Sequence, residues 1–315
     1  MRAVHITRFG GPEVLTPVDL PEPTPGPGEV VVTVEACGVN FMDVHRTSDT
    51  YLNPTELPHV PGGEVVGRTP DGLRVIALMD GGGYAEKAVA DHRLVAPVPD
   101  DLDAARALAL GVPGLSAWHL LRGSARLRAG ETVVINGASG GVGTIAVQLA
   151  KLFGAGRVIA AASTKDKRAL ARDLGADVTI DGSAPGYADR VLEANGGNRV
   201  DVVLDPIGGA VFDAALDTLA STGRMVTYGA TSMTMPTPLT IDHLITRNIS
   251  ITGFWLTRVT TLPHMYREPL ARLHELALAK RLVPVIGGTY PLAEAHRAHE
   301  ALLSRRTQGK LVLIP

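Results

Sequence analysis

Short runs of apolar, β-branched residues separated by glycine and proline characterise the first third of the chain. One such run covers residues 29–36, and shorter runs cover residues 64–67 and 74–78. The proline-rich stretch at residues 21–28 is incompatible with a helix. Apolar runs of this length, bounded by turn residues, are typical of strands. We therefore expect a compact, β-barrel-like domain in this part of the chain.

Beyond about Asp103 the pattern changes to an alternation of helix and strand. This alternation predicts an α/β domain, in which helices cover both faces of a parallel sheet. The predicted strands are residues 131–136, 157–162, 200–205, 223–228 and 249–254. The predicted helices are residues 103–110, 141–153, 165–174 and 211–219.

The last part of the chain no longer follows this alternation. From about Pro284 it contains one predicted helix, at residues 292–303, and one predicted strand, at residues 310–314. We expect this tail to return to the first domain or to pack at the junction of the two domains.

Composition and charge exclude several classes of protein. The chain has 315 residues and a formal net charge of −2, so it has no electrostatic footprint for nucleic acid or for a membrane surface. Its single cysteine, Cys37, excludes an internal disulfide and a cysteine-based metal site. Residues 132–150 are uncharged, but glycines, Asn136 and Gln148 interrupt them, so we expect no membrane span. The N-terminus has no long apolar core; we expect no signal peptide and a cytoplasmic location.

A glycine-rich turn joins the strand at residues 131–136 to the helix that follows it. Gly137, Gly140 and Gly143 are spaced by three residues. Without β-carbons, the backbone amides can approach a pyrophosphate, and the helix N-terminus offers N–H donors with a partial positive charge. This context predicts a dinucleotide site; the alternative is a tight turn that binds no ligand.

The residues after the next strand indicate which dinucleotide is bound. An NAD site usually has an acidic residue about 20 residues after the turn. Here the strand ends at Ala162 and is followed by Ser163, Lys165, Lys167 and Arg168. A 2′-phosphate needs hydroxyl donors and cations, so Ser163 and Lys167 predict NADPH. Lys165 alone is as well explained by a solvated helix face, and Asp166 argues mildly against a phosphate site.

Five motifs together give the chain a resemblance along its whole length. They are residues 36–43 (Ala-Cys-Gly-Val-Asn-Phe-Met-Asp), 60–64 (Val-Pro-Gly-Gly-Glu), 138–143, 205–209 (Asp-Pro-Ile-Gly-Gly) and 305–310 (Arg-Arg-Thr-Gln-Gly-Lys). With them the chain resembles the zinc-independent quinone oxidoreductases of the medium-chain dehydrogenase/reductase superfamily. The resemblance implies a Rossmann doubly wound sheet at residues 113–282, which binds NADPH. It also implies a GroES-like β-barrel catalytic domain at residues 1–112, completed by residues 283–315.

The same resemblance implies a site without zinc. Zinc-dependent members carry a Cys after the Gly-Val pair and a His before the Glu. Here these positions are Asn40 and Gly63, and only Glu64 remains. Cys37 and His59 stand at the wrong offsets, and a catalytic zinc needs about three protein ligands. We therefore expect no metal.

The resemblance further implies which residues contact the cofactor. Ser116 stands where the family usually has Thr, and Phe254 and Trp255 border the nicotinamide pocket or serve as core or interface. Tyr228 and Gly229 end a predicted strand of the parallel sheet, where ligands of such sheets bind. The expected cofactor contacts are Asn40, Ser116, Ala138, Ser139, Gly140, Gly141, Val142, Ser163, Lys167, Tyr228, Gly229, Phe254, Trp255 and Arg305.

Three residues are candidates for catalysis. Asn40 takes the place of the zinc-binding cysteine, so its amide is expected to face the reacting centre rather than to serve only the loop. Tyr51 matches a tyrosine of the substrate cleft, as a donor to the substrate or as a wall of the cleft. His45 fills the family's second cleft-tyrosine position and is either an acid or a surface histidine. Lys310 matches a recurrent family position or belongs to a solvated tail.

These residues favour hydride transfer from NADPH to a quinone or an α,β-unsaturated carbonyl, whose carbon is electrophilic without a metal. One alternative is an enoyl-thioester reductase, because residues 253–256 also resemble that branch. Another is a non-catalytic, crystallin-like protein that binds NADPH. The resemblance also implies a homodimer, in which the strand at residues 249–254 pairs across a two-fold axis.

Overall fold

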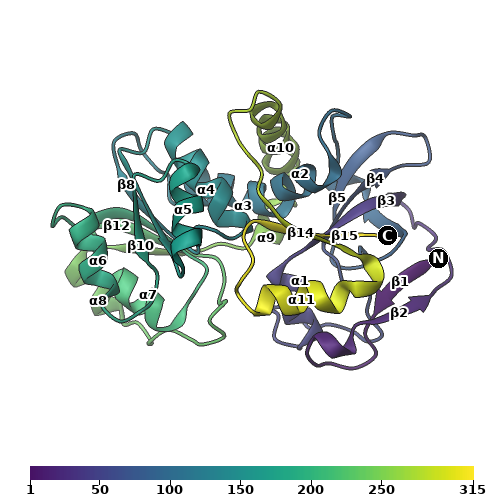
Figure 1. Ribbon diagram of the computed structural model, residues 1–315, viewed down its shortest axis with the longest axis horizontal. Coiled ribbons are helices and arrows are strands. Elements are labelled where there is room, and N and C mark those ends of the chain that lie inside the picture. Colours follow the sequence, from purple (N-terminus) through teal and green to yellow (C-terminus); the bar gives the residue numbers. More distant parts are fainter. The chain divides into compact units, whose positions relative to one another are not determined.

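The chain divides into two units in a computed structural model, which describes residues 1–315 except for the side chain of Pro263 (Figure 1). The first unit contains Met1–Leu115 and Thr257–Pro315, and the second contains Ser116–Leu256. Residues 257–282, which the sequence analysis placed with the dinucleotide domain, thus belong to the first unit. The reason is local packing: Tyr266 donates from its hydroxyl to the carbonyl oxygen of Ile76 at 3.2 Å.

The first unit is built on a seven-stranded sheet with the order β14-β15-β3-β4-β5-β7, in which β6 also pairs with β3. The long strand β3 (Glu29–Val39) pairs antiparallel with β4, β6 and β15, so the final strand returns to the first domain as expected. The other strands are β4 (Glu64–Arg68), β5 (Arg74–Leu78), β6 (Lys87–Asp91), β7 (Val95–Pro97), β14 (Ile286–Pro291) and β15 (Lys310–Ile314). Strands β1 (Arg2–His5) and β2 (Thr16–Asp19) form a separate antiparallel pair.

Short helices connect these strands. Helix α1 (Phe41–Thr47) follows β3 directly, and α2 (Ala104–Ala109) continues into a π-helical turn, η3 (Leu110–Gly114). This turn contains Pro113, and Gly111 departs from helical geometry within it, with ψ of −114°. The remaining helices are α9 (Leu256–Val259), α10 (Pro263–Leu278), α11 (Ala295–Leu303) and the 3-10 turns η1 (Pro12–Val14), η2 (His92–Leu94) and η5 (Leu292–Glu294).

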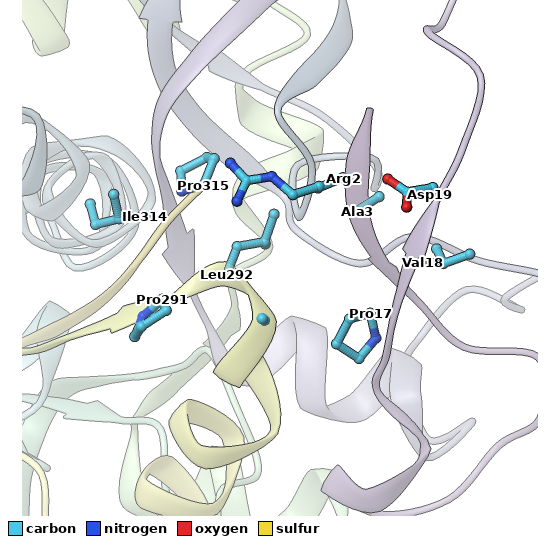
Figure 2. A pocket seen from close by; sticks show the side chains of 10 residues that line it. Arg2, Ala3, Pro17, Val18, Asp19, Pro291, Leu292, Ile314 and Pro315 are labelled. Atoms are coloured by element: carbon cyan, nitrogen blue, oxygen red, sulfur yellow. The ribbon is translucent and has the colours of Figure 1, made fainter.

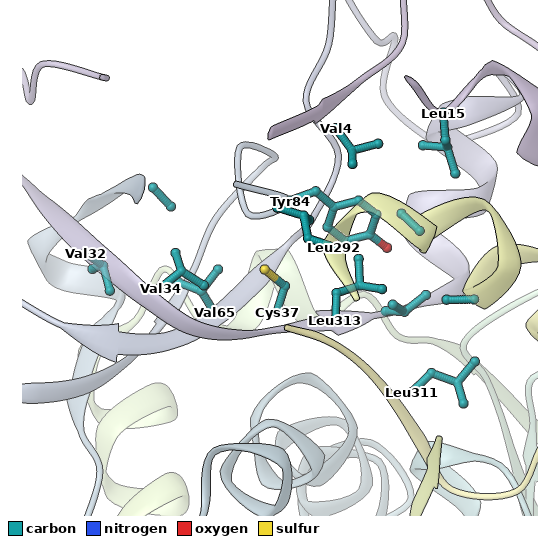
Figure 3. Packing of buried hydrophobic residues seen from close by; sticks show 14 of the residues in the cluster. Val4, Leu15, Val32, Val34, Cys37, Val65, Tyr84, Leu292, Leu311 and Leu313 are labelled. Atoms are coloured by element: carbon teal, nitrogen blue, oxygen red, sulfur yellow. The ribbon is translucent and has the colours of Figure 1, made fainter. Parts of the chain in front are cut away.

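The core of the first unit packs strands β3, β4 and β15 against the start of the chain and against α11 (Figure 3). Tyr84 lies within this apolar cluster, and its hydroxyl brings a polar group into it. It donates to Asp43 Oδ2 at 3.3 Å and lies 3.0 Å from His299 Nε2. Burial raises the pKa of Asp43 to about 6 and lowers the pKa of His299 to about 4, so the imidazole is neutral at pH 7.

The second unit is a six-stranded sheet with the order β10-β9-β8-β11-β12-β13, and all its pairings are parallel. This is the doubly wound order of dinucleotide-binding folds. Figure 1 shows α4 and α5 on one side of the sheet and α6 and α7 on the other. The strands are β8 (Thr132–Asn136), β9 (Arg157–Ala162), β10 (Val178–Asp181), β11 (Val200–Asp205), β12 (Leu219–Thr227) and β13 (Ser250–Gly253). The helices are α3 (Leu115–His119), α4 (Gly141–Leu152), α5 (Lys165–Asp173), α6 (Tyr187–Ala194), α7 (Gly209–Leu216), α8 (Ile241–Arg247) and the π-helical turn η4 (Leu120–Ser124).

The predicted elements agree with these bounds to different degrees. The predicted strands at residues 157–162, 200–205 and 310–314 coincide with β9, β11 and β15. The predicted strand at residues 223–228 is too short, because β12 begins at Leu219, whose pairing with Val200 is separated from the main register by an irregularity. The predicted helix at residues 211–219 ends too late for the same reason, since Leu219 already belongs to the sheet.

The hydroxyl of Tyr84 gives a test of the first unit's core. Replacing Tyr84 with Phe leaves Asp43 and His299 with one partner fewer in an apolar cluster, so we expect a loss of about 1–3 kcal/mol of unfolding free energy. Urea denaturation measures this loss. Tyr290→Phe is the control, because Tyr290 packs at the edge of the same cluster and the described residues give its hydroxyl no hydrogen bond. Equal losses in the two variants would contradict the assignment.

Candidate functional site

The glycine-rich turn of the second unit lies between the end of β8 and the start of α4. Gly137 has φ of +62°, a conformation that favours glycine. A β-carbon on Gly143 would lie 2.3 Å from the carbonyl oxygen of Gly137, so this position has room only for hydrogen. The turn is therefore tight, and the first N–H groups of the twelve-residue helix α4 point out of its N-terminus. Such a cradle fits an anionic pyrophosphate.

A buried polar network lies beneath this turn and was not predicted from the sequence. Asn136 donates from Nδ2 to Asp205 Oδ1 at 2.9 Å and accepts from the hydroxyl of Tyr187 at 2.6 Å. Asp205 also accepts from the backbone N–H of Gly208 at 2.9 Å. Burial raises the pKa of Asp205. The network ties the ends of β8 and β11 together and so fixes the start of the turn.

The end of β9 carries the residues predicted for the 2′-phosphate. Ser163 is exposed, whereas Lys167 is largely buried, and burial lowers the pKa of its ammonium. Arg168 donates from Nη1 to the carbonyl oxygen of Ala162 at 2.9 Å and to Asp181 Oδ2 at 3.3 Å. Two cations, Lys167 and Arg168, thus accompany the strand end, and the carboxylate of Asp181 is paired.

The other predicted cofactor contacts of this unit lie near strand ends or at the start of a helix. Ser116 is buried in α3, and Tyr228 and Gly229 follow β12 directly. The backbone N–H of Phe254 donates to the carbonyl oxygen of Thr227 at 2.9 Å. The ring of Phe254 stacks on the imidazole of His119, with the two centroids 6.4 Å apart. Trp255 follows and is half-buried. The tips of β12 and β13 therefore carry these side chains at the carboxyl edge of the sheet, where ligands of such sheets bind.

In the first unit, Asn40 belongs to a buried cluster with Glu64 and Lys310. Lys310 Nζ donates to Glu64 Oε1 at 2.5 Å and to Asn40 Oδ1 at 2.7 Å. Asn40 Nδ2 in turn donates to Glu64 Oε1 at 3.0 Å. Lys310 is 2% exposed, so the alternative of a solvated tail is wrong: β15 carries its side chain inward.

The residues of this cluster do not fit a zinc site. Glu64 accepts from Lys310 and Asn40 on one oxygen and from the backbone N–H of Val112, at 2.8 Å, on the other. The ammonium of Lys310 would repel a divalent cation. A β-carbon on Gly63 would lie 2.0 Å from the methyl carbon of Met42, which fills the place of a histidine. Among the described residues, no three His, Cys, Asp or Glu side chains form a group that could hold a metal ion.

His45 and Tyr51 follow Asn40 but have other partners. His45 Nδ1 lies 2.8 Å from Thr50 Oγ1, and burial lowers the pKa of the imidazole. The guanidinium of Arg46 lies over the ring of Tyr51, 4.8 Å from its centroid, and pairs with Asp80. Among the described residues, no hydrogen bond joins the side chains of Asn40 and His45. Arg46 was not predicted, because nothing in its local pattern shows that it is buried.

The last predicted cofactor contact, Arg305, is an exposed residue with φ of +54° that follows α11.

The hollow in Figure 2, of about 470 Å³, lies beside β1, β2 and the C-terminus, and is lined by Arg2, Asp19, Leu292 and neighbouring residues. None of its described lining residues was predicted for the site. No helix of the described chain is long and apolar enough to cross a membrane.

Comparisons with known proteins agree with this geometry. Residues 26–71 match the alcohol dehydrogenase GroES-like domain family, and residues 141–275 match the zinc-binding dehydrogenase family. The quinone oxidoreductase of Rattus norvegicus is 32% identical, over 100% of this chain and 98% of its own length. The Escherichia coli quinone oxidoreductase complexed with NADPH superposes with a TM-score of 0.94 at 30% identity, covering both chains fully.

A mycobacterial structure complexed with NADPH superposes with a TM-score of 0.93 at 37% identity, again over 100% of both chains. Both family models and full-length relatives above 30% identity therefore agree with the motifs and the two units described above. The chain belongs to the quinone oxidoreductase family of the medium-chain dehydrogenase/reductase superfamily.

Proposed function

We propose that the protein is an NADPH-dependent reductase that transfers hydride to quinones or α,β-unsaturated carbonyls without zinc. The observation that carries the proposal is the buried Asn40–Glu64–Lys310 cluster, which has a hydrogen-bonding amide where zinc-dependent members have a metal ligand. Full-length relatives named quinone oxidoreductases and neighbours complexed with NADPH support it.

The residues present fit NADPH in two places. The amides of Ala138, Ser139, Gly140, Gly141 and Val142 form the cradle for the pyrophosphate, and Ser163 and Lys167 hold the 2′-phosphate. Ser116, Tyr228, Gly229, Phe254, Trp255 and Arg305 complete the proposed cofactor contacts. When bound, NADPH supplies the hydride, and the protein's part is to bind, orient and exclude water. The second unit, Ser116–Leu256, is then mainly the cofactor-binding part, and the first unit is mainly the catalytic part.

The proposed catalytic residues act on the substrate oxygen. When hydride adds to a conjugated carbonyl compound, negative charge develops on that oxygen, and a hydrogen-bond donor stabilises it. Asn40 offers an amide for this, Tyr51 a hydroxyl and His45 an imidazole. The lowered pKa of His45 keeps its ring neutral at pH 7, so it carries one N–H to donate.

The choice of cofactor tests the 2′-phosphate site. Lys167→Ala removes a charge-assisted hydrogen bond of about 1.5–3 kcal/mol, so we expect the KM for NADPH to rise roughly tenfold or more while the KM for NADH stays within about twofold. Ser163→Asp, which repels a 2′-phosphate, should shift the ratio further toward NADH. Arg172→Ala is the control, because it removes a cation from the far end of the same helix. An unchanged NADPH preference in both site variants would contradict the assignment.

Substrate comparison separates the proposed function from its alternatives. With NADPH, we expect kcat/KM for 1,4-naphthoquinone to exceed that for crotonyl-CoA by at least about tenfold, since a difference of 1.4 kcal/mol in transition-state binding already gives that ratio. NADPH oxidation at 340 nm measures both. The opposite preference would favour an enoyl-thioester reductase. Tight NADPH binding with no turnover of either substrate would favour a non-catalytic, crystallin-like protein.

We also propose that the protein is a cytoplasmic homodimer. Strand β13 is the last strand of its sheet, and in the described chain only β12 pairs with it. Ile241 and Ile245 on the neighbouring α8 are 74% and 68% exposed. An unpaired edge beside apolar side chains supports isologous pairing with a second copy. A cytoplasmic location fits a reductase that needs a continuous supply of NADPH.

Light scattering tests the dimer. We expect a mass near twice the 33.0 kDa of one chain, and a monomer when Ile241 and Ile245 are both replaced by Lys. The physical reason is that two buried charges oppose the association of apolar faces. Leu73→Lys, at a turn residue that is 48% exposed in the first unit, is the control and should leave the mass unchanged. A monomeric unmodified protein, or a dimeric double variant, would overturn the proposal.

A further inference from the structure

The final strand places a cation inside the first unit, next to the proposed catalytic amide. Lys310 is 2% exposed, and its ammonium has three N–H donors. All three have partners: Glu64 Oε1 at 2.5 Å, Asn40 Oδ1 at 2.7 Å and the carbonyl oxygen of Val39 at 3.1 Å. Burying an ion pair often brings little net stability, so stability alone does not account for this one.

The carboxylate that faces Lys310 is held from every side. A β-carbon on Gly38 or on Gly111 would lie 2.4 Å from an oxygen of Glu64, so the carboxylate fits between two glycines. Its second oxygen accepts from the backbone N–H of Val112 at 2.8 Å. This contact uses the kink at Gly111, where ψ is −114°. Glu64 is 0% exposed and therefore offers Asn40 a fixed acceptor.

These two charges determine which way the amide of Asn40 points. Its carbonyl oxygen faces the ammonium of Lys310, which cannot accept a hydrogen bond, and its NH2 group faces the carboxylate of Glu64. Turning the amide by 180° would place NH2 against ammonium and oxygen against carboxylate. The backbone N–H of Asn40 is also fixed, by Asp43 Oδ2 at 2.8 Å.

One polar hydrogen of this amide stays available. Asn40 Nδ2 carries two hydrogens, of which one goes to Glu64, and the described residues give the other no partner. The residue itself is only partly buried. The carbonyl oxygen is already committed to a cation. What Asn40 can present to a bound molecule is therefore chiefly an N–H donor.

We propose that Lys310 is a positioning residue, which with Glu64 fixes Asn40 as a hydrogen-bond donor to a carbonyl oxygen. The proposal rests on the proposed function, because it assigns the direction of a contact within that site. The carbonyl oxygen belongs either to the substrate, where charge develops, or to the carboxamide of the nicotinamide. A donor is favourable for both, whereas an acceptor would repel them.

The first experiment tests the donor role with both members of the ion pair kept in place. Asn40→Asp replaces the NH2 group with an oxygen of nearly the same size. We expect kcat/KM for NADPH-dependent reduction of 1,4-naphthoquinone to fall about as far as in Asn40→Ala, at least tenfold. Activity of Asn40→Asp near that of the unmodified protein would overturn the donor role. A rise only in the KM for NADPH identifies the carboxamide as the acceptor, and a fall only in kcat identifies the substrate.

The second experiment tests Lys310 by a double-mutant cycle. Lys310→Met alone leaves a buried carboxylate unpaired and is expected to fold poorly, so it is combined with Glu64→Gln. In this neutral background we expect the same constant that Asn40→Asp changes, either kcat or the KM for NADPH, to worsen at least tenfold. Adding Asn40→Ala to this background should then lower kcat/KM less than threefold, because the amide is no longer oriented there. An additive cost of Asn40→Ala, or unmodified values of both kcat and the KM for NADPH in the neutral background, would overturn the proposal.

A matched ion pair serves as the control for this cycle. Glu22 and Lys87 pair at 2.6 Å on the surface of the same unit, and Glu22→Gln with Lys87→Met should leave kcat and the cost of Asn40→Ala unchanged. Failure of the proposed function gives a different result, since the unmodified protein would then not reduce 1,4-naphthoquinone. If the neutral double variant does not fold, the outcome rests on Asn40→Asp, which retains both members of the ion pair.

Discussion

Lys310 and Glu64 place two opposite charges out of water at the point where β3, β4 and β15 meet. Neither charge is tolerable there alone, and both Lys310 and Glu64 have fixed hydrogen-bond partners. The pair joins residues 246 positions apart in the chain, and it fixes the end of β3, the kink at Gly111 and the amide of Asn40. The first unit is thus organised around its chemistry as much as around its apolar core.

The proposed dinucleotide cradle of the second unit depends on backbone geometry rather than on an ion pair. The cradle consists of backbone amides, so its precision comes from the tightness of a turn rather than from paired charges. That tightness depends on Gly137 and Gly143, and on the hydrogen bonds of Asn136 with Asp205 and Tyr187 beneath them. Because backbone amides alone cannot distinguish NADPH from NADH, the proposed function assigns this discrimination to the side chains after β9.

Local patterns predicted what local forces determine. The strands β9, β11 and β15 and the glycine turn could be read from the sequence because apolar runs and glycine spacing are short-range signals. Helix α10 could not, since two prolines interrupt its pattern: Pro263 stands in the first helical turn, where proline is tolerated, but Pro269 lies inside the helix. The burial of Lys310 and Arg46 could not either, because it depends on partners distant in the chain, such as Glu64 and Asp80.

Where zinc-dependent members have metal ligands, at Asn40 and Gly63, other groups of this chain fill the space. The methyl group of Met42 fills the space beside Gly63, and the ammonium of Lys310 supplies positive charge beside Glu64. A divalent cation polarises an alcohol or carbonyl strongly enough to activate it, whereas an amide N–H stabilises charge only as it develops. A site of the second kind suits substrates that are already electrophilic at carbon. With the proposed function, this exchange of ligands would favour quinones and conjugated carbonyls over simple alcohols, because the substrate itself must then supply an electrophilic carbon.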